Sequence, residues 1–229
     1  MSNLDTLLRV VGKLGALHEE FVFVGGIVNG LYVTVPLTPG PRPTTDVDVV
    51  CEAVTYSGYM RVGRALADLG FGQGASRGDP PFRWRHESDI LDVIPVGEDV
   101  LGFTNRWYRR GIADPWLVEM KGGGPRIKLF APPYHLAAKL AAYADRGADD
   151  PFASPDLEDI VGLLANRPEL VAEVQQADPV VSTWIREAVR WALADERQDE
   201  LLSAHLPPDL PRDALAVVRA RVRAVTQEI

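Results

Sequence analysis

The chain has few of the residues on which disulfide-bonded, zinc-dependent or hydrolytic proteins depend. It contains 1 cysteine, Cys51, in 229 residues, so no disulfide can form within it. That usage is typical of a reducing compartment, and we expect a cytoplasmic protein. No pair of cysteines or histidines has the spacing of zinc ligands, and no serine-centred motif is present. The histidines are scattered: His18, His86, His135 and His205.

The chain also has no long apolar segment. Residues 1–20 have leucine and valine at helical spacing with charges between them, which predicts an amphipathic helix and not a signal peptide. Residues 21–41 carry no charge and approach the ~20 residues of a membrane span. The glycines and prolines in that segment argue instead for strand, turn and loop. We therefore expect no membrane association.

Positive charge is scarce in the C-terminal part of the chain. Residues 1–130 carry 14 Lys and Arg against 15 Asp and Glu, whereas residues 131–229 carry 10 against 17. This balance argues against strong nonspecific binding of nucleic acid but allows a local basic patch. The candidate patch mixes cations and aromatic residues, and it is either a nucleic-acid surface or a solvated hairpin rim: Arg106, Trp107, Tyr108, Arg109, Arg110, Trp116, Lys121, Arg126 and Lys128.

The most informative pattern is a pair of aspartates one residue apart. Asp46 and Asp48 alternate with Val47, Val49 and Val50, which predicts a strand on which both carboxylates share one face. Carboxylates held so close repel each other unless a cation lies between them. A divalent metal is the expected partner.

Two further features belong beside this pair. The apolar run Phe21–Val24 ends at Gly25 and Gly26, whose amides could approach a phosphate closely. Asp92 is the single charge in the apolar strand Ile90–Ile94. If that strand lies beside the Asp46 strand, three carboxylates could converge on one or two metal ions; the alternative is an aspartate in a strand-end turn.

Helices dominate beyond residue 132, and we place the boundary between an αβ half (1–130) and a helical half (131–229) at about residue 130. On the helix Tyr134–Arg146, an exposed Lys139 and Arg146 share a flank that suits a triphosphate or neutralises nearby carboxylates. On the next helix, Asp156 and Asp159 lie away from the apolar stripe. That side is either a solvated face or one that borders an active-site cleft.

Taken in order, these motifs resemble the abortive-infection (AbiEii-like) nucleotidyltransferases of the DNA-polymerase-beta-like superfamily. The resemblance covers residues 20–165 and rests on Gly25-Gly26, the Arg42–Asp48 run, the strand around Asp92, Lys139 with Arg146, and the Asp156–Asp159 helix. The superfamily often has Gly-Ser in place of Gly25-Gly26. Residues 166–229 match nothing in it.

The resemblance implies an α+β fold with a mixed sheet flanked by helices, a helical C-terminal half, Mg2+ (or Mn2+) and an NTP donor. It places Asp46 and Asp48 on the metals, with Asp92 as the third carboxylate and Asp159 in the catalytic cleft. It assigns Gly25, Gly26 and Lys139 to the nucleotide, and we expect Thr45 and Arg146 to bind it as well.

The same resemblance implies a toxin of a toxin–antitoxin pair, with an antitoxin as partner, that transfers a nucleoside monophosphate to RNA. We expect the 3′ end of tRNA as acceptor. Two other functions stay open: transfer to a small polycationic molecule such as an aminoglycoside, which the acidic C-terminal half would suit, or nucleotide binding without catalysis.

Overall fold

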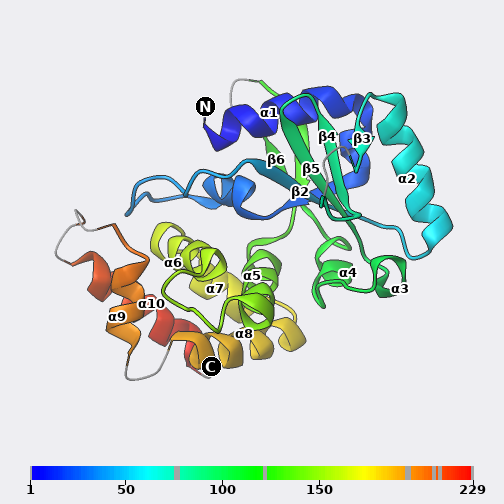
Figure 1. Ribbon diagram of the computed structural model, residues 1–229. Helices are drawn as coiled ribbons and strands as arrows, with labels where there is room; N and C mark the ends of the chain where they lie inside the picture. Colours follow the sequence, from blue (N-terminus) through cyan, green and yellow to red (C-terminus); the bar gives the residue numbers. More distant parts are fainter. Residues whose placement is uncertain are drawn as a thin grey trace. The chain divides into compact units, whose positions relative to one another are not determined.

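The computed structural model describes residues 2–74, 78–120, 123–193, 197–207, 210 and 213–227 (Figure 1). It confirms the expected α+β class, a mixed sheet flanked by helices followed by a helical C-terminal half. The chain forms two compact units. The first comprises Met1–Gly30 and Arg42–Ala131, and the second comprises Leu31–Pro41 and Pro132–Ile229. The short segment Leu31–Pro41 therefore belongs to the helical unit, although it lies between two strands of the sheet in the sequence.

The first unit is built on a seven-stranded sheet of order β3-β4-β5-β2-β1-β7-β6. β2 pairs with β5 and β1 with β7 in parallel, and the other neighbours are antiparallel. The central strands are rich in valine and other apolar residues because a strand in mid-sheet is covered on both faces. The strands are β1 (Phe21–Val24), β2 (Asp46–Cys51), β3 (Gly72–Gln73), β4 (Arg83–His86), β5 (Asp89–Pro95), β6 (Trp116–Glu119) and β7 (Arg126–Leu129).

Helices α1 (Asn3–Leu14) and α2 (Tyr56–Asp68) lie on the same side of the sheet (Figure 1). Ser2 and Asp5 form a capping box that starts α1, and Arg9 of that helix binds the buried Asp89 of β5 at 2.6 Å. Gly63 of α2 lies against the ring of Trp84 in β4. Asp89 and Trp84 therefore mark the helix-covered face. Because side chains alternate along a strand, Asp92 points to the opposite face.

Short elements complete the first unit. They are η1 (Gly15–Glu20), α3 (Glu98–Leu101), α4 (Tyr108–Gly111) and most of η2 (Gly26–Tyr32), which begins at the glycine pair after β1. Gly111 of α4 packs directly against the buried ring of Phe130. A side chain at position 111 would displace that ring.

The second unit consists of helices packed around leucine, isoleucine and valine side chains. Its helices are α5 (Pro132–Arg146), α6 (Pro155–Asn166), α7 (Leu170–Gln176), α8 (Pro179–Leu193), α9 (Gln198–Ala204) and α10 (Ala214–Thr226). Ser154 caps α6 and Pro155 occupies its first turn. No helix in the part of the chain that the structure describes has both the length and the apolar character needed to cross a membrane.

Asn166 at the end of α6 holds the segment Leu31–Pro41 to the helical unit. Its side-chain oxygen accepts hydrogen bonds from the amides of Leu37 and Thr38 at 2.8 and 2.9 Å, and its backbone carbonyl accepts those of Thr34 and Val35. Four amides of a proline-rich loop thus donate to two oxygen atoms of one residue, which fixes the path of a loop that has no regular secondary structure of its own.

Candidate functional site

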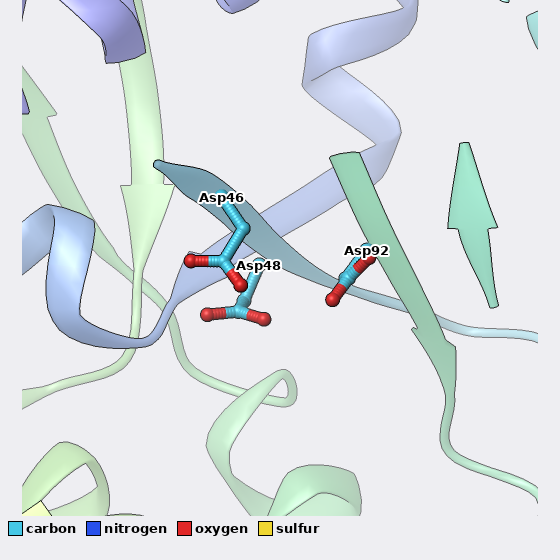
Figure 2. A group of neighbouring side chains, drawn as sticks. All are labelled: Asp46, Asp48 and Asp92. Atoms are coloured by element: carbon cyan, nitrogen blue, oxygen red, sulfur yellow. The ribbon is translucent and has the colours of Figure 1, made fainter. Parts of the chain in front are cut away.

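Three carboxylates converge on the face of the sheet that α1 and α2 leave uncovered. Asp46 and Asp48 lie on β2, and Asp48 is directly opposite Asp92 on the parallel strand β5. One oxygen atom from each carboxylate lies within 4.8 Å of the other two, and Figure 2 shows the three side chains pointing toward one another. β5 therefore lies beside β2, which is the arrangement that convergence requires.

The donor set fits a hard divalent cation. Carboxylate oxygens are the ligands that such ions prefer, and three of them within 4.8 Å can bind one ion together. Asp92 is buried at 3 % exposure, while Asp46 and Asp48 are partly exposed, so one side of the cluster is open. Burial raises the pKa of Asp92, and the hydrogen bonds from Arg83 oppose that rise. These residues could hold a metal ion.

Arg83 of β4 is a member of this cluster that sequence analysis missed. Its Nε donates to Asp92 Oδ1 at 2.8 Å and its Nη2 to Asp92 Oδ2 at 2.7 Å. The same Nη2 lies 3.4 Å from Asp46 Oδ2. The alternating pattern of residues 82–86 predicts the strand, but nothing in the pattern says that β4 pairs with β5 in the register that sets Arg83 against Asp92.

Thr44 also contacts the cluster, and the sequence carried a signal for it. Its hydroxyl donates to Asp46 Oδ1 at 2.7 Å. Thr44, Asp46 and Asp48 follow one another at every second position, so one face of an extended chain carries all three. The neighbouring Thr45, which we assigned to the nucleotide, is exposed.

The glycine turn after β1 lies beside the carboxylates. Gly25 has a φ of +79°, and a Cβ atom at this position would collide with the Asp48 carboxylate. Val24 is paired with Asp48 across β1 and β2, which explains the close approach. Position 25 therefore requires glycine both for its backbone conformation and for the space that Asp48 occupies. Gly26 follows as the first residue of η2.

Lys139 and Asp159 lie in the second unit, where they form a buried ionic cluster with Asp156. Lys139 Nζ is 2.6 Å from Asp159 Oδ2 and 3.3 Å from Asp156 Oδ1. Arg146 donates to both oxygens of Asp156 at 2.8 and 3.1 Å. Burial favours a raised pKa for Asp156, but the bonds from Arg146 and the charge of Lys139 bring that pKa below its ordinary value.

This cluster corrects two expectations about α5 and α6. The Lys139 side chain is not exposed, because only 9 % of it is accessible. Asp156 and Asp159 do not form a solvated face either, since both are buried against α5. The apolar stripe is therefore only part of the buried surface of α6. Its acidic side is buried as well, because Lys139 pairs with Asp156 and Asp159 there. His135, on the same flank, is buried against the ring of Tyr32 at 4.4 Å, and burial lowers its pKa well below the usual value.

The candidate basic patch is only partly as expected. Arg106, Arg109 and Arg110 are exposed around α4. Trp107 is 3 % exposed, so its ring packs into the unit and cannot stack on a base. Of the remaining members, Trp116 is partly buried on β6, Arg126 is exposed on β7, and Lys128 donates to the Glu19 carbonyl. The Tyr108 ring of α4 packs on Phe130. Lys121 lies outside the described residues.

Comparison of the chain with protein families and with curated proteins finds no match.

The glycine turn supplies the first prediction. Gly25→Ala should lower the free energy of unfolding by ~1–2 kcal/mol through backbone strain and should also displace Asp48, weakening Mn2+ binding. The matched control is Gly15→Ala, where φ is +53° but nothing lies within 4 Å of a new Cβ. Urea denaturation and Mn2+ titration should show a stability loss in both variants and a binding loss in Gly25→Ala alone. Equal Mn2+ binding by the two variants would contradict this account.

The buried ionic cluster of Lys139, Asp156 and Asp159 supplies the second prediction. Lys139→Met should lower the free energy of unfolding by ~3 kcal/mol, because it removes the cation that lies 2.6 Å from the buried Asp159 carboxylate and 3.3 Å from that of Asp156. Arg146→Met is the control, since that side chain is 71 % exposed and its bond to Asp156 should contribute at most ~1 kcal/mol. Urea denaturation at pH 7 measures both changes. A loss for Lys139→Met no larger than that for Arg146→Met would show that burial of Lys139 does not govern stability.

Proposed function

We propose that this protein is a metal-dependent nucleotidyltransferase of the abortive-infection type, which moves a nucleoside monophosphate from an NTP to an acceptor. The observation that carries the proposal is the convergence of Asp46, Asp48 and Asp92 beside the glycine turn at Gly25. Carboxylates that hold Mg2+ next to a glycine turn are a combination suited to a nucleoside triphosphate.

The three carboxylates would hold one or two Mg2+ ions, which supply charge stabilisation for the triphosphate and the leaving pyrophosphate. The glycine turn would let backbone amides approach the phosphates. In the reaction, an acceptor hydroxyl oxygen forms a bond to the α-phosphorus and loses its proton to water. The bond from that phosphorus to the β-bridging oxygen breaks, and pyrophosphate leaves with the electron pair.

By the family resemblance alone, Lys139 would bind the nucleotide and Asp159 would belong to the catalytic residues. Asp156 and Asp159 hold the Lys139 ammonium in one orientation, which supports a fixed point charge for a phosphate. Arg146 would then serve chiefly to neutralise Asp156. The toxin role and an antitoxin partner rest on the resemblance.

We propose RNA, at the 3′ end of tRNA, as the acceptor. Exposed Arg106, Arg109 and Arg110 lie in the same unit as the carboxylates and suit phosphates of an RNA strand. Screening beyond ~8 Å at physiological salt allows such a patch to act despite the net charge of −8. The alternative, a small polycationic acceptor, is favoured by the excess of acidic residues in 131–229.

The catalytic proposal predicts the effect of two substitutions. Asp46→Asn and Asp48→Asn should each reduce nucleotidyl transfer on the order of 100-fold or more, because a metal ligand is lost. Without metal both variants should melt at or above the wild-type temperature, since carboxylate repulsion is relieved. The control is Asp114→Asn, an exposed aspartate of the same unit. Near wild-type transfer by either site variant would refute the proposal.

The acceptor proposal is tested by incubating the protein with each α-labelled NTP, Mg2+ and a cell lysate. Label should enter RNA, and the double reversal of Arg109 and Arg110 to Glu should abolish this while NTP binding persists. The control reverses Arg61 and Arg64, two exposed arginines of α2 on the helix-covered side of the sheet. Label in small molecules or protein, with RNA unlabelled under all four NTPs, would replace RNA as acceptor and leave the transfer chemistry standing.

A further inference from the structure

The guanidinium of Arg83 lies where two of the metal-binding carboxylates approach each other. Its Nη2 is 2.7 Å from Asp92 Oδ2 and 3.4 Å from Asp46 Oδ2. Its Nε donates a hydrogen bond to Asp92 Oδ1 at 2.8 Å. Arg83 thus engages both oxygens of the most buried carboxylate and reaches a second carboxylate with the same nitrogen.

This placement follows from strand register. Arg83 and Asp92 are direct partners across the antiparallel pair β4–β5, so their side chains leave the same face of the sheet. A bidentate Arg–carboxylate pair is a strong and geometrically specific interaction. The Arg83 side chain is 23 % exposed and that of Asp92 5 %, so water screens the pair only in part.

A divalent ion shared by Asp46 and Asp92 would need to contact the oxygens that Nη2 now faces. Metal–oxygen distances of ~2.1 Å for Mg2+ leave no room for an N–H group between the same two oxygens. The positive charge of Arg83 would also repel a cation bound so close to it. The metal and the guanidinium are therefore alternatives at this position.

We propose that Arg83 is a built-in counter-cation, which occupies the Asp92 and Asp46 carboxylates of the metal-free protein and which a divalent metal must displace to engage Asp92. The proposal rests on the metal site of the proposed function. It explains how three close carboxylates are tolerated without metal. It also implies that the metal binds through Asp46 and Asp48 first, and that full coordination is reached only when Arg83 moves away.

The same strand offers a matched control. Arg85 lies two residues further along β4 and makes an equivalent bidentate pair with Asp79, with both bonds at 2.8 Å. The side-chain exposures are 27 % for Arg85 and 7 % for Asp79, close to those of the Arg83 pair. Asp79 is not one of the converging carboxylates.

The test is a titration of the full-length protein with Mn2+ in the absence of nucleotide. Binding is measured as the loss of the electron paramagnetic resonance signal of free Mn2+. Arg83→Gln should bind Mn2+ at least about tenfold more tightly than the wild type, and Arg85→Gln should match the wild type. Without metal, both variants should melt below the wild type. Saturating Mn2+ should raise the melting temperature of Arg83→Gln by more than that of Arg85→Gln.

Affinity in Arg83→Gln that is equal to or weaker than in the wild type would overturn the proposal, since Arg83 would then orient Asp92 for the metal and not compete with it. Should Arg83→Gln fail to fold, Arg83→Lys can replace it, because lysine keeps the charge but loses the bidentate contact with Asp92. We expect this variant to bind Mn2+ several-fold more tightly than the wild type. No gain in that variant would equally overturn it. Asp48→Asn identifies the site: Mn2+ binding that survives this change, or no Mn2+ binding by any variant, would refute the metal site itself.

Discussion

The repulsion among three carboxylates on one face of a sheet is the constraint around which the first unit is built. Parallel pairing of β2 with β5 sets Asp48 opposite Asp92, and the two-residue repeat adds Asp46. The neighbouring residues reduce the energetic cost of this concentration of charge. Arg83 supplies a cation, and Thr44 supplies a hydroxyl donor. Charge that stays concentrated after such compensation is suited to a metal ion.

In the second unit, a lysine neutralises two neighbouring carboxylates. Asp156 and Asp159 are buried on α6, and Lys139 of α5 lies between them. In both units a cation from a neighbouring element makes a pair of acidic side chains compatible with packing. The difference is exposure: the side chains of Lys139, Asp156 and Asp159 are at most 9 % exposed, whereas the Asp46 side chain is 34 % exposed and can meet a ligand. The cluster of Asp46, Asp48 and Asp92 is therefore accessible to a ligand, whereas the cluster around Lys139 also forms part of the buried interior.

The architecture was largely predictable because it depends on local patterns. Apolar runs predicted β1 and β5, and a two-residue alternation predicted β2. The change to helical periodicity near residue 130 predicted a helical C-terminal half, whereas the α+β class with its mixed sheet was what the family resemblance implied. The path of Leu31–Pro41 was not predictable, since it depends on Asn166, which lies more than 120 residues away in the chain. A proline-rich loop has no periodicity from which its partner could be inferred.

The sequence by itself determined the local patterns from which the candidate site is built. An Asp-x-Asp repeat, a glycine pair and a lone aspartate in an apolar strand are visible without coordinates. Only the tertiary structure decided what each side chain faces. Arg83 joined the cluster through strand register, while Trp107 and Lys139 turned out to be buried. The physical reason is that alternation and helical repeat assign a residue to a face, but burial and pairing depend on which distant element covers that face.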